Sequence, residues 1–518
     1  MEKRLVLAIA LSLLVLLSWS ALVPKSQILD NKVVIANSAQ LATSPQKTSS
    51  LKAPSEEMPL SKDFVQETIK FTQDSREIIF NPARATIVEV VFKDGPEHRL
   101  PLKIGFLTEG NLAFKQESVT QDAISFIYED KNKRIIKKFI IPKHSYVIEL
   151  EILVQNLSSS SLLLNPQVVL GRLDLSAKNT QSRYQDIFLS NKDKTMHLSA
   201  GKDFNSPEVK FAGLRDQYFC VIAEPVNLTA SAYIKKIMPQ ESEVGLVMNE
   251  ISLKPGAQIG HSFRIYLGPQ DLKIIDKIKP EWTLIVRYGS FDFIDFIAQL
   301  LLQLLGFFYG LVHNWGLAII ILSISVYFLL FPLSIKQMRS MKEMQLLQPK
   351  IEALRKELKD NPQKLNKEIM ELYKEHKVNP LGGCLPLLLQ MPIFFALYQA
   401  LIRSVALRGA HFLWIKDLSS PDKAWVFKNS IPFLGNQLNI LPILMAIGMF
   451  VQQKISMAKA IGEAAQQQKM MSIIMPIMFG VIFYQMPSGL VLYWFVNSLF
   501  MLGYQFSINR QSMQRIAN

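Results

Sequence analysis

Hydroxyl and amide side chains recur inside segments that are otherwise apolar enough to lie in a lipid bilayer. Ser323 and Tyr327 are four residues apart in the run AIIILSISVYFLLFPLS (318–334), and Tyr493 and Asn497 have the same spacing near the C-terminus. Residues four apart share one face of an α-helix, so each pair is predicted to present its polar groups in one direction. Such groups can hydrogen-bond between helices, or they can line a path for a polar substrate. Both roles remain open at this point.

The same apolar segments lack the residue patterns that support covalent catalysis. They contain no glycine-rich phosphate loop, no His and Cys set with metal-ligand spacing, and no nucleophile beside a general base. We therefore expect no catalytic residue, no cofactor and no metal, and we do not expect an enzyme. The chemistry that remains is physical, because a polar recess lowers the free energy of moving polar groups through hydrocarbon.

Composition and charge point to a membrane protein. The chain has 518 residues, 49% of them hydrophobic, and a formal net charge of +14. Its basic residues flank the apolar segments, which is the pattern that orients membrane proteins, so nucleic acid is not expected as a specific ligand. Cys220 and Cys384 fall in different predicted units, and a disulfide between them is not expected.

The N-terminal segment is either a cleaved signal peptide or a retained anchor. Lys3 and Arg4 precede the apolar run LVLAIALSLLVLLSWSALV, whose length favours a transmembrane anchor at 1–23. Residues 24–60 are rich in Ser, Thr, Pro and Lys, which predicts a flexible tether.

A large β domain is predicted for 61–280. Short stretches rich in valine, isoleucine and aromatic residues alternate with polar residues and are separated by Asn, Asp, Gly and Pro. This pattern is typical of antiparallel strands, and we expect a large soluble β-sandwich. Such folds often bind sugars, but the histidines here belong to no tight cluster with acidic residues: His98, His144, His197 and His261.

The next segment, 291–313, is long enough to cross a bilayer, yet polar residues recur along one helical face. This stripe predicts an amphipathic helix lying in the membrane interface. Only 316–334 is then counted as crossing, because two crossings would place the basic segment 336–377 outside. The stripe consists of Asp292, Asp295, Gln299 and Gln303.

Apolar residues with helical spacing flank the turn sequence KDNPQ within 336–377, which predicts a helical hairpin in the cytoplasm. It is either a solvated charged loop or a docking surface for a ribosome, a targeting factor or anionic lipid. Four more spans follow, with 403–438 outside and the C-terminus inside. We therefore expect six transmembrane helices, five of them after the β domain, and both termini in the cytoplasm.

Several motifs between about 314 and 508 resemble the YidC membrane protein insertases, in the long form with an outer-facing β domain. They occur in the order of that family and are NWGLAIIILSISVYFLLFPLS, LQPKIEALRKEL, VNPLGGCLPLLLQMPIFFALYQAL, FLWIKDLS and MPSGLVLYWFVNSL. The resemblance implies a five-helix insertase core (314–510) and a periplasmic β domain in the bacterial inner membrane. It also implies a folding chaperone that acts on client membrane proteins, alone or beside the Sec translocon.

The resemblance further implies a site, because in this family the spans surround a hydrophilic groove that is open toward the cytoplasm. Pro392 is predicted to kink its span and shape that groove, since proline removes a backbone donor. The alternative is ordinary hydrogen bonding between helices. The residues assigned to the client groove are Ser323, Tyr327, Gln390, Met391, Tyr493, Trp494 and Asn497.

One position departs from the family pattern. The family carries an arginine in this groove, and the matching position here is Tyr327, with no Lys or Arg between Leu317 and Leu333. An arginine would attract acidic client segments, whereas tyrosine offers one hydroxyl and an aromatic face. We expect a polar but uncharged groove that suits weakly charged clients.

Two other functional classes fit parts of the sequence. Intramembrane polar residues also occur in transporters and channels, although no inverted repeat is evident here. Alternatively, the β domain could be a sugar-binding or sugar-converting unit that the helices anchor. Deleting 61–280 separates these hypotheses, because an insertase should keep most activity in its helices.

Overall fold

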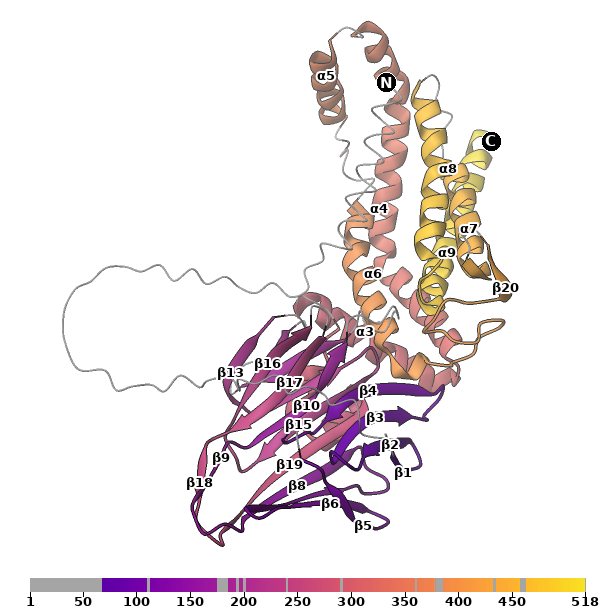
Figure 1. Cartoon of the computed structure of the whole chain (residues 1–518). Helices are drawn as coiled ribbons and strands as arrows, with labels where there is room; N and C mark the ends of the chain where they lie inside the picture. Colours follow the sequence, from indigo (N-terminus) through magenta and orange to yellow (C-terminus); the bar gives the residue numbers. More distant parts are fainter. Residues whose placement is uncertain are drawn as a thin grey trace, which may run out of the picture. The chain divides into compact units, whose positions relative to one another are not determined.

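The structure is a computed structural model of the whole chain (Figure 1). The expected anchor at 1–23 and tether at 24–60 lie outside the described residues. The chain forms two compact units, Met1–Pro269 and Gln270–Asn518. The residues described are 68–109, 112–174, 185–191, 195–198, 202–238, 241–288, 292–358, 361–376, 378, 385–431, 435–456 and 463–517.

The first unit is built from antiparallel strands in two layers. The first layer contains a sheet in the order β1 (Ile69–Thr72), β2 (Arg76–Asn81), β3 (Thr86–Phe92) and β4 (His98–Gly105). A second sheet of this layer has the order β10 (Gln167–Asp174), β17 (Glu241–Met248), β16 (Ala230–Met238) and β13 (Phe204–Val209). An isolated bridge between Leu107 and Val169 connects the two sheets.

The second layer is one nine-stranded sheet. Its order is β12 (Thr195–Leu198), β11 (Asp186–Ser190), β14 (Phe211–Arg215), β15 (Phe219–Val226), β19 (Gln258–Pro269), β8 (Val147–Asn156), β7 (Lys133–Ile140), β6 (Ala123–Glu129) and β5 (Lys115–Val119). A short ribbon pairs β18 (Ile251–Leu253) with β9 (Leu162–Leu164). The large β domain expected from the alternating pattern is therefore present, and its last strand ends at Pro269, before the predicted boundary at 280.

Alternation along the strands builds the core between the layers. In β8, Ile148, Leu150 and Ile152 are buried while the intervening glutamates are exposed, because successive side chains of a strand point to opposite faces. Aromatic pairs join the layers: the ring centroids of Phe92 and Phe219 are 3.8 Å apart. This packing gives the first unit its own hydrophobic core.

A buried lysine also joins the two layers. The Lys137 ammonium on β7 donates hydrogen bonds to the carbonyls of Ala85 and Phe106, both at 2.6 Å. Both carbonyls belong to residues with positive φ, 50° and 66°. Burial lowers the pKa of Lys137 to about 7, because the charged form is poorly solvated there. Lys137 thus fixes two tight backbone bends at the cost of a buried cation.

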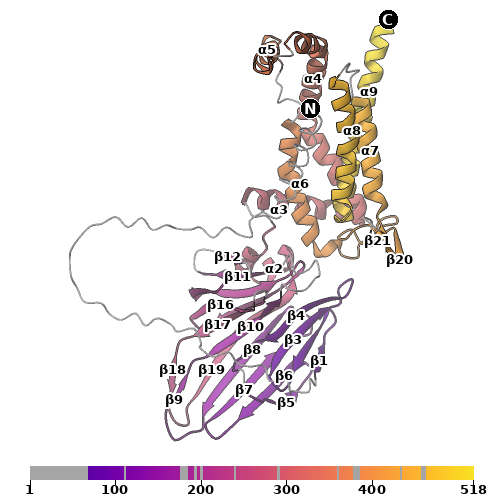
Figure 2. The same ribbon diagram turned by 45° about the horizontal axis from the view of Figure 1, so that its top comes forward.

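The second unit is helical. It contains α2 (Leu272–Ile278), α3 (Asp292–Val312), α4 (Trp315–Glu357), α5 (Pro362–Glu375), α6 (Leu385–Arg403), the hairpin β20 (Trp425–Ile431) and β21 (Gly435–Leu438), α7 (Ile440–Ser456), α8 (Glu463–Phe483) and α9 (Ser488–Ala517). Helices α4, α6, α7, α8 and α9 run side by side (Figures 1 and 2).

Three segments among the described residues are long and apolar enough to cross a membrane: Asp292–Val312, Trp315–Pro332 and Ser488–Phe506. Ile440–Ile455 and Ser472–Phe483 are apolar but shorter. Helix α3 is thus a candidate span by length and composition. Figure 2 shows it lying across the ends of α4 and α6 rather than alongside them.

The polar residues at the start of α3 are occupied by local hydrogen bonds. The Asp295 carboxylate accepts from the Tyr288 N–H at 2.7 Å and from the Gln299 amide at 2.9 Å. Asp292 pairs with Arg287 at 2.8 Å. The face turned away from the bundle is mainly apolar and includes Phe293, Phe296, Leu300, Leu304, Phe307 and Leu311, all exposed. Its chemistry suits contact with lipid.

The charged segment forms two packed helices, because α4 continues past the apolar region and α5 folds back beside it (Figure 1). The Asn361 side chain caps α5 by accepting from the Lys364 N–H at 3.1 Å, and Pro362 occupies the first turn. Leu347, Ile351 and Val378 form a small core, against which Met344, Ile369, Leu372 and Tyr373 pack.

Candidate functional site

A cavity of about 250 Å³ lies among four helices of the second unit. Its walls come from α4, α6, α7 and α9, segments that are far apart in the sequence. The lining residues are Val326, Tyr327, Leu330, Ser334, Gln390, Met449, Gln452, Trp494, Asn497, Ser498 and Met501.

Helix α4 supplies one wall through residues on successive turns. Tyr327, Leu330 and Ser334 follow the spacing of three and four residues that places side chains on one helical face. Ser323 lies one turn earlier, is fully buried, and donates its hydroxyl to the Ile319 carbonyl at 2.7 Å. Ser323 therefore bonds to its own helix and does not line the cavity.

Tyr327 combines a packed ring with an unpaired hydroxyl. Its ring centroid lies 5.5 Å from that of Phe500 and 5.7 Å from that of Phe331. The buried hydroxyl oxygen has no hydrogen-bond partner among the described residues. Tyr327 on α4 and Asn497 on α9 each bring an uncharged polar side chain to the cavity wall.

Gln390 and Tyr493 act together. The Gln390 amide nitrogen donates to the Tyr493 hydroxyl at 2.8 Å, which links α6 to α9. Tyr493 is fully buried and does not line the cavity, whereas Gln390 does. Met391 is half-buried and lies outside the lining, and Pro392 lies inside α6 next to it. Tyr493 therefore positions Gln390, and the kink expected at Pro392 stays a prediction.

Trp494 is held by other aromatic rings. Its ring centroid lies 5.4 Å from Phe394, 5.7 Å from Phe479 and 5.5 Å from Phe483. This packing fixes a large amphipathic side chain at the cavity wall. The structure thus brings together Tyr327, Gln390, Trp494 and Asn497 of the predicted set.

Several wall residues were not among those expected from the sequence. Ser334 is seven residues, or two helical turns, after Tyr327, and this spacing could have revealed it. Gln452 lies at the end of an apolar run, just before Lys454, where an amide is easily taken for a helix-end residue. In the described part of the chain, no side chain that lines the cavity carries a formal charge. The described lining thus combines hydroxyl and amide groups with apolar side chains and contributes no formal charge.

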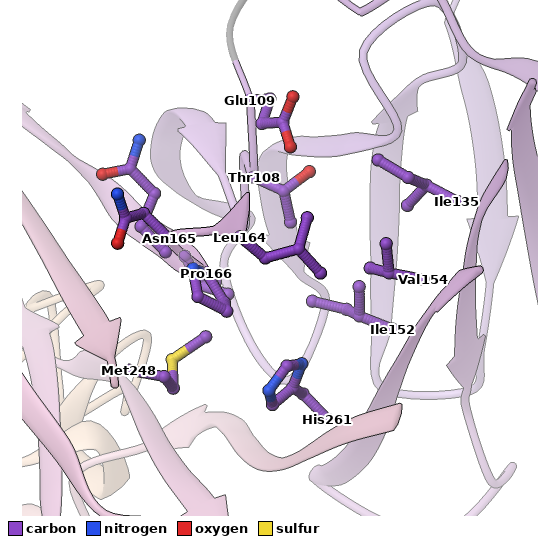
Figure 3. A pocket seen from close by; sticks show the side chains of 12 residues that line it. Thr108, Glu109, Ile135, Ile152, Val154, Leu164, Asn165, Pro166, Met248 and His261 are labelled. Atoms are coloured by element: carbon purple, nitrogen blue, oxygen red, sulfur yellow. The ribbon is translucent and has the colours of Figure 1, made fainter. Parts of the chain in front are cut away.

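The β-rich unit has a smaller pocket, of about 40 Å³ (Figure 3). Small-molecule sites usually enclose roughly 300 Å³ or more, so this one holds only a few waters. His261 lines it, and burial lowers the pKa of His261, which keeps the ring neutral at neutral pH. Within the described ranges, no group of three or more His, Cys, Asp or Glu residues could hold a metal ion. The pocket offers no visible catalytic arrangement.

Comparisons with known proteins agree across the whole chain. The family model described as 60Kd inner membrane protein matches 307–515, and the model of the YidC periplasmic domain matches 86–304. The membrane protein insertase YidC of Syntrophobacter fumaroxidans is 35% identical over 421 residues, covering 79% of this chain and 74% of the relative. That of Geotalea uraniireducens is 32% identical and covers 98% of this chain and 99% of the relative. A crystal structure of an active YidC insertase with its first transmembrane domain resolved is 22% identical, with a TM-score of 0.41, covering 85% of this chain and 92% of that one.

Proposed function

The chain belongs to the YidC family of membrane protein insertases, and from this premise we propose that the cavity among α4, α6, α7 and α9 receives client segments. The protein is a membrane protein insertase of the inner membrane with a periplasmic domain, its partners are client membrane proteins, and it is not an enzyme in the bond-making sense. One observation carries the proposal: uncharged polar side chains from four separate helices, Tyr327, Gln390, Gln452 and Asn497, line one shared cavity.

The proposed mechanism is exchange of hydrogen bonds. A polar group taken into hydrocarbon without a partner costs roughly 2–7 kcal/mol. The hydroxyl of Tyr327 and the amides of Gln390, Gln452 and Asn497 offer replacement partners to a client's polar residues while they pass the apolar core. Because these partners are neutral, they lower the free-energy barrier to crossing the apolar core without retaining the client by electrostatic attraction. An apolar client segment then leaves into lipid, where its side chains are better solvated.

Neutrality should also set client preference. Because the described wall residues include no cation, acidic client segments gain no Coulomb attraction from them, and burying their carboxylates remains expensive. Clients with few charges are the natural substrates of such a groove. Ser323, Met391, Tyr493 and Pro392 belong to the proposal as supports of the groove, since each lies on α4, α6 or α9 beside the lining.

We infer the membrane topology from the same helices. Six transmembrane helices, five of them in the core 314–510, require α6, α7 and α8 to cross as well, although the apolar segments of α7 and α8 are short. Helix α3 lies in the interface, which its exposed apolar face supports. Both termini and the α4–α5 hairpin are cytoplasmic, and the basic flanks of the spans support this orientation. Single cysteines at Lys367 and Lys416 test this topology. A membrane-impermeant thiol reagent should label the cysteine at 367 only from the cytoplasmic side and the cysteine at 416 only from the periplasmic side.

The α4–α5 hairpin is the proposed docking surface for a ribosome, a targeting factor or anionic lipid, and the Sec translocon is a proposed partner of the whole protein. Support comes from the hairpin's own small core, which holds exposed basic residues on a defined scaffold. Co-sedimentation with ribosomes, compared with a variant that carries Lys364→Glu and Lys367→Glu, tests the ribosome. If the variant binds ribosomes at low salt as well as the native protein does, the ribosome is not a partner of this surface.

Reconstitution tests the function itself. The purified protein is placed in liposomes, and protease protection of a short single-span client measures insertion. We expect protected client with the protein and none in empty liposomes. A cavity that instead conducts a small solute, without protecting the client, would favour a transporter.

A further inference from the structure

A tight turn between α6 and α7 carries two large apolar side chains at its tip. Phe412 and Ile415 form an isolated antiparallel bridge in which each N–H donates to the other's carbonyl at 2.9 Å. Leu413 and Trp414 therefore form a two-residue tip. Leu413 is 75% exposed and Trp414 is 40% exposed. Apolar side chains are thus presented where a soluble loop would place polar ones.

The backbone of this tip is strained. Leu413 has φ of +52°, in the left-handed region that glycine and asparagine usually occupy in two-residue turns. A bulky side chain keeps such a conformation only where the surrounding structure imposes it. The strain indicates that the position of the Leu413 side chain matters more than local stability.

The surrounding structure does impose it. The Phe412 ring lies directly against Gly316 at the start of α4, where a Cβ would come within 2.0 Å of the ring. The Asp422 carboxylate accepts from the Trp414 indole N–H at 3.2 Å and from the Leu441 N–H, near the start of α7, at 2.7 Å. The tip is therefore tied to two helices of the bundle.

The segment is also tied to α9. The N–H of Ser488 donates to the Ser420 carbonyl at 2.8 Å, and the N–H of Gly489 donates to the Leu418 carbonyl at 2.9 Å. The described parts of this segment, 404–431 and 435–439, thus form a cap that is held rigidly against one end of the bundle. A rigid cap holds its exposed apolar side chains out permanently, so they cannot fold inward to escape water.

The same cap carries a second apolar projection. Trp425 and Val426 on β20 are 65% and 60% exposed. Figures 1 and 2 show the β20–β21 hairpin at the end of the bundle opposite α5 and the C-terminus. A two-stranded hairpin is marginally stable by itself in water. Both projections therefore need a surface to cover them.

We propose that Leu413, Trp414, Trp425 and Val426 insert into the lipid interface at this end of the helices and seat the cap on the bilayer. The helix that follows exposes apolar side chains such as Ile443 and Ile447, so lipid surrounds the bundle up to the level of the cap. Tryptophan is enriched at the headgroup level of membranes, where its ring is apolar and its N–H remains polar.

Charge and area favour lipid over a protein partner. Exposed Lys423 and Lys428 lie within the same cap, where they suit anionic headgroups. A two-residue tip and one edge of a short hairpin offer far less area than the roughly 800 Å² per partner of a stable protein interface. Insertion of these four side chains would hold the outer ends of α4, α7 and α9 at a fixed depth in the bilayer, whether or not a client is bound.

The test places an environment-sensitive fluorophore on Leu413→Cys in the full chain, with Cys384→Ser and the buried Cys220 retained. The protein is reconstituted in vesicles of phosphatidylcholine and phosphatidylglycerol, with bromine atoms near the headgroup end of the acyl chains. Lys416→Cys, three residues away and exposed, is the matched control. As a second measurement, tryptophan emission in brominated vesicles is compared for the native chain and for Trp414→Phe with Trp425→Phe.

At position 413, we expect lipid bromine to quench the fluorophore and aqueous iodide to leave it unquenched. At position 416, we expect iodide to quench the fluorophore and bromine to leave it unquenched. Removing both tryptophans should reduce the share of tryptophan emission that bromine quenches. Iodide access at both positions would overturn the proposal. Protection from iodide without quenching by bromine, or protection that disappears when the protein is diluted with lipid, would assign the surface to a protein or to a second copy and would overturn it as well.

Discussion

Tyr327 brings an uncharged aromatic side chain to the cavity wall, and its ring packs against Phe500. An arginine, which the resemblance to the family implies at this position, would attract carboxylates from a distance. A tyrosine hydroxyl acts only at contact. Client charge should therefore affect this insertase differently from a relative with a cation in the groove.

We predict that Tyr327→Arg raises insertion of a client with two or three acidic residues several-fold, while insertion of its neutral counterpart changes little. The added cation attracts the carboxylates at the stage where they leave water. Protease protection in liposomes measures both clients side by side. Tyr327→Phe, which keeps the ring contacts, should lower insertion of both clients modestly, because it removes only the hydroxyl. Equal insertion of acidic and neutral clients by the native protein would contradict the neutral groove.

Lys137 gives the β-rich unit a specific pH dependence. Its pKa is about 7 in the folded chain and about 10.5 when unfolded, so between these values the unfolded chain binds more protons. The free energy of unfolding should therefore rise from pH 7 toward pH 10, and below pH 7 the contribution should be constant. Pulse proteolysis in urea at pH 6, 7.5 and 9 measures this slope. Lys137→Met should flatten it, whereas exposed Lys138→Met should leave it unchanged. If the slope persists in Lys137→Met, the pH dependence of the free energy of unfolding arises from other titratable groups.

At the scale of elements, one buried hydrogen bond joins α6 to α9. We predict that Gln390→Leu destabilises the bundle by about 1–3 kcal/mol, because it removes the Gln390 donor from the fully buried Tyr493 hydroxyl. Thermal unfolding in detergent measures the loss. Tyr493→Phe combined with Gln390→Leu should recover part of the stability, since both partners are then apolar. Purely additive effects in this cycle would mean that the two side chains do not interact.

Helix α6 carries a further prediction at Pro392, whose missing N–H leaves the helix open to bending beside Gln390. If the bend shapes the groove, Pro392→Ala should shift client crosslinks at Gln390 and Trp494 to other positions. Site-specific crosslinking to a stalled client measures this. An unaltered crosslinking pattern would show that Pro392 has no part in groove shape.

The elements could be anticipated from periodicity, but the cavity walls could not. Alternation predicted the β strands and the helical spacing around KDNPQ predicted α4 and α5, because both patterns are local. Gln452 and Ser334 were missed because their roles depend on how α7 and α4 pack against α9, which no local pattern encodes. Ser323 was included by spacing, yet its hydroxyl bonds to its own helix. Spacing identifies a helical face, and tertiary contacts decide which part of that face meets a cavity.

At the scale of the whole molecule, the two units have separate cores, which makes the division of labour testable. The β-rich unit buries its aromatic residues between its own layers, and its pocket of about 40 Å³ is too small to enclose a sugar. The cavity proposed to receive client segments lies in the helical unit. We therefore predict that deleting 61–280 leaves most of the insertion activity in reconstituted liposomes. Resistance of the shortened chain to alkaline extraction serves as the control for membrane integration. Complete loss of insertion by an integrated chain would mean that the β-rich unit takes part in the function, because the helices alone would then lack what moves a client into lipid.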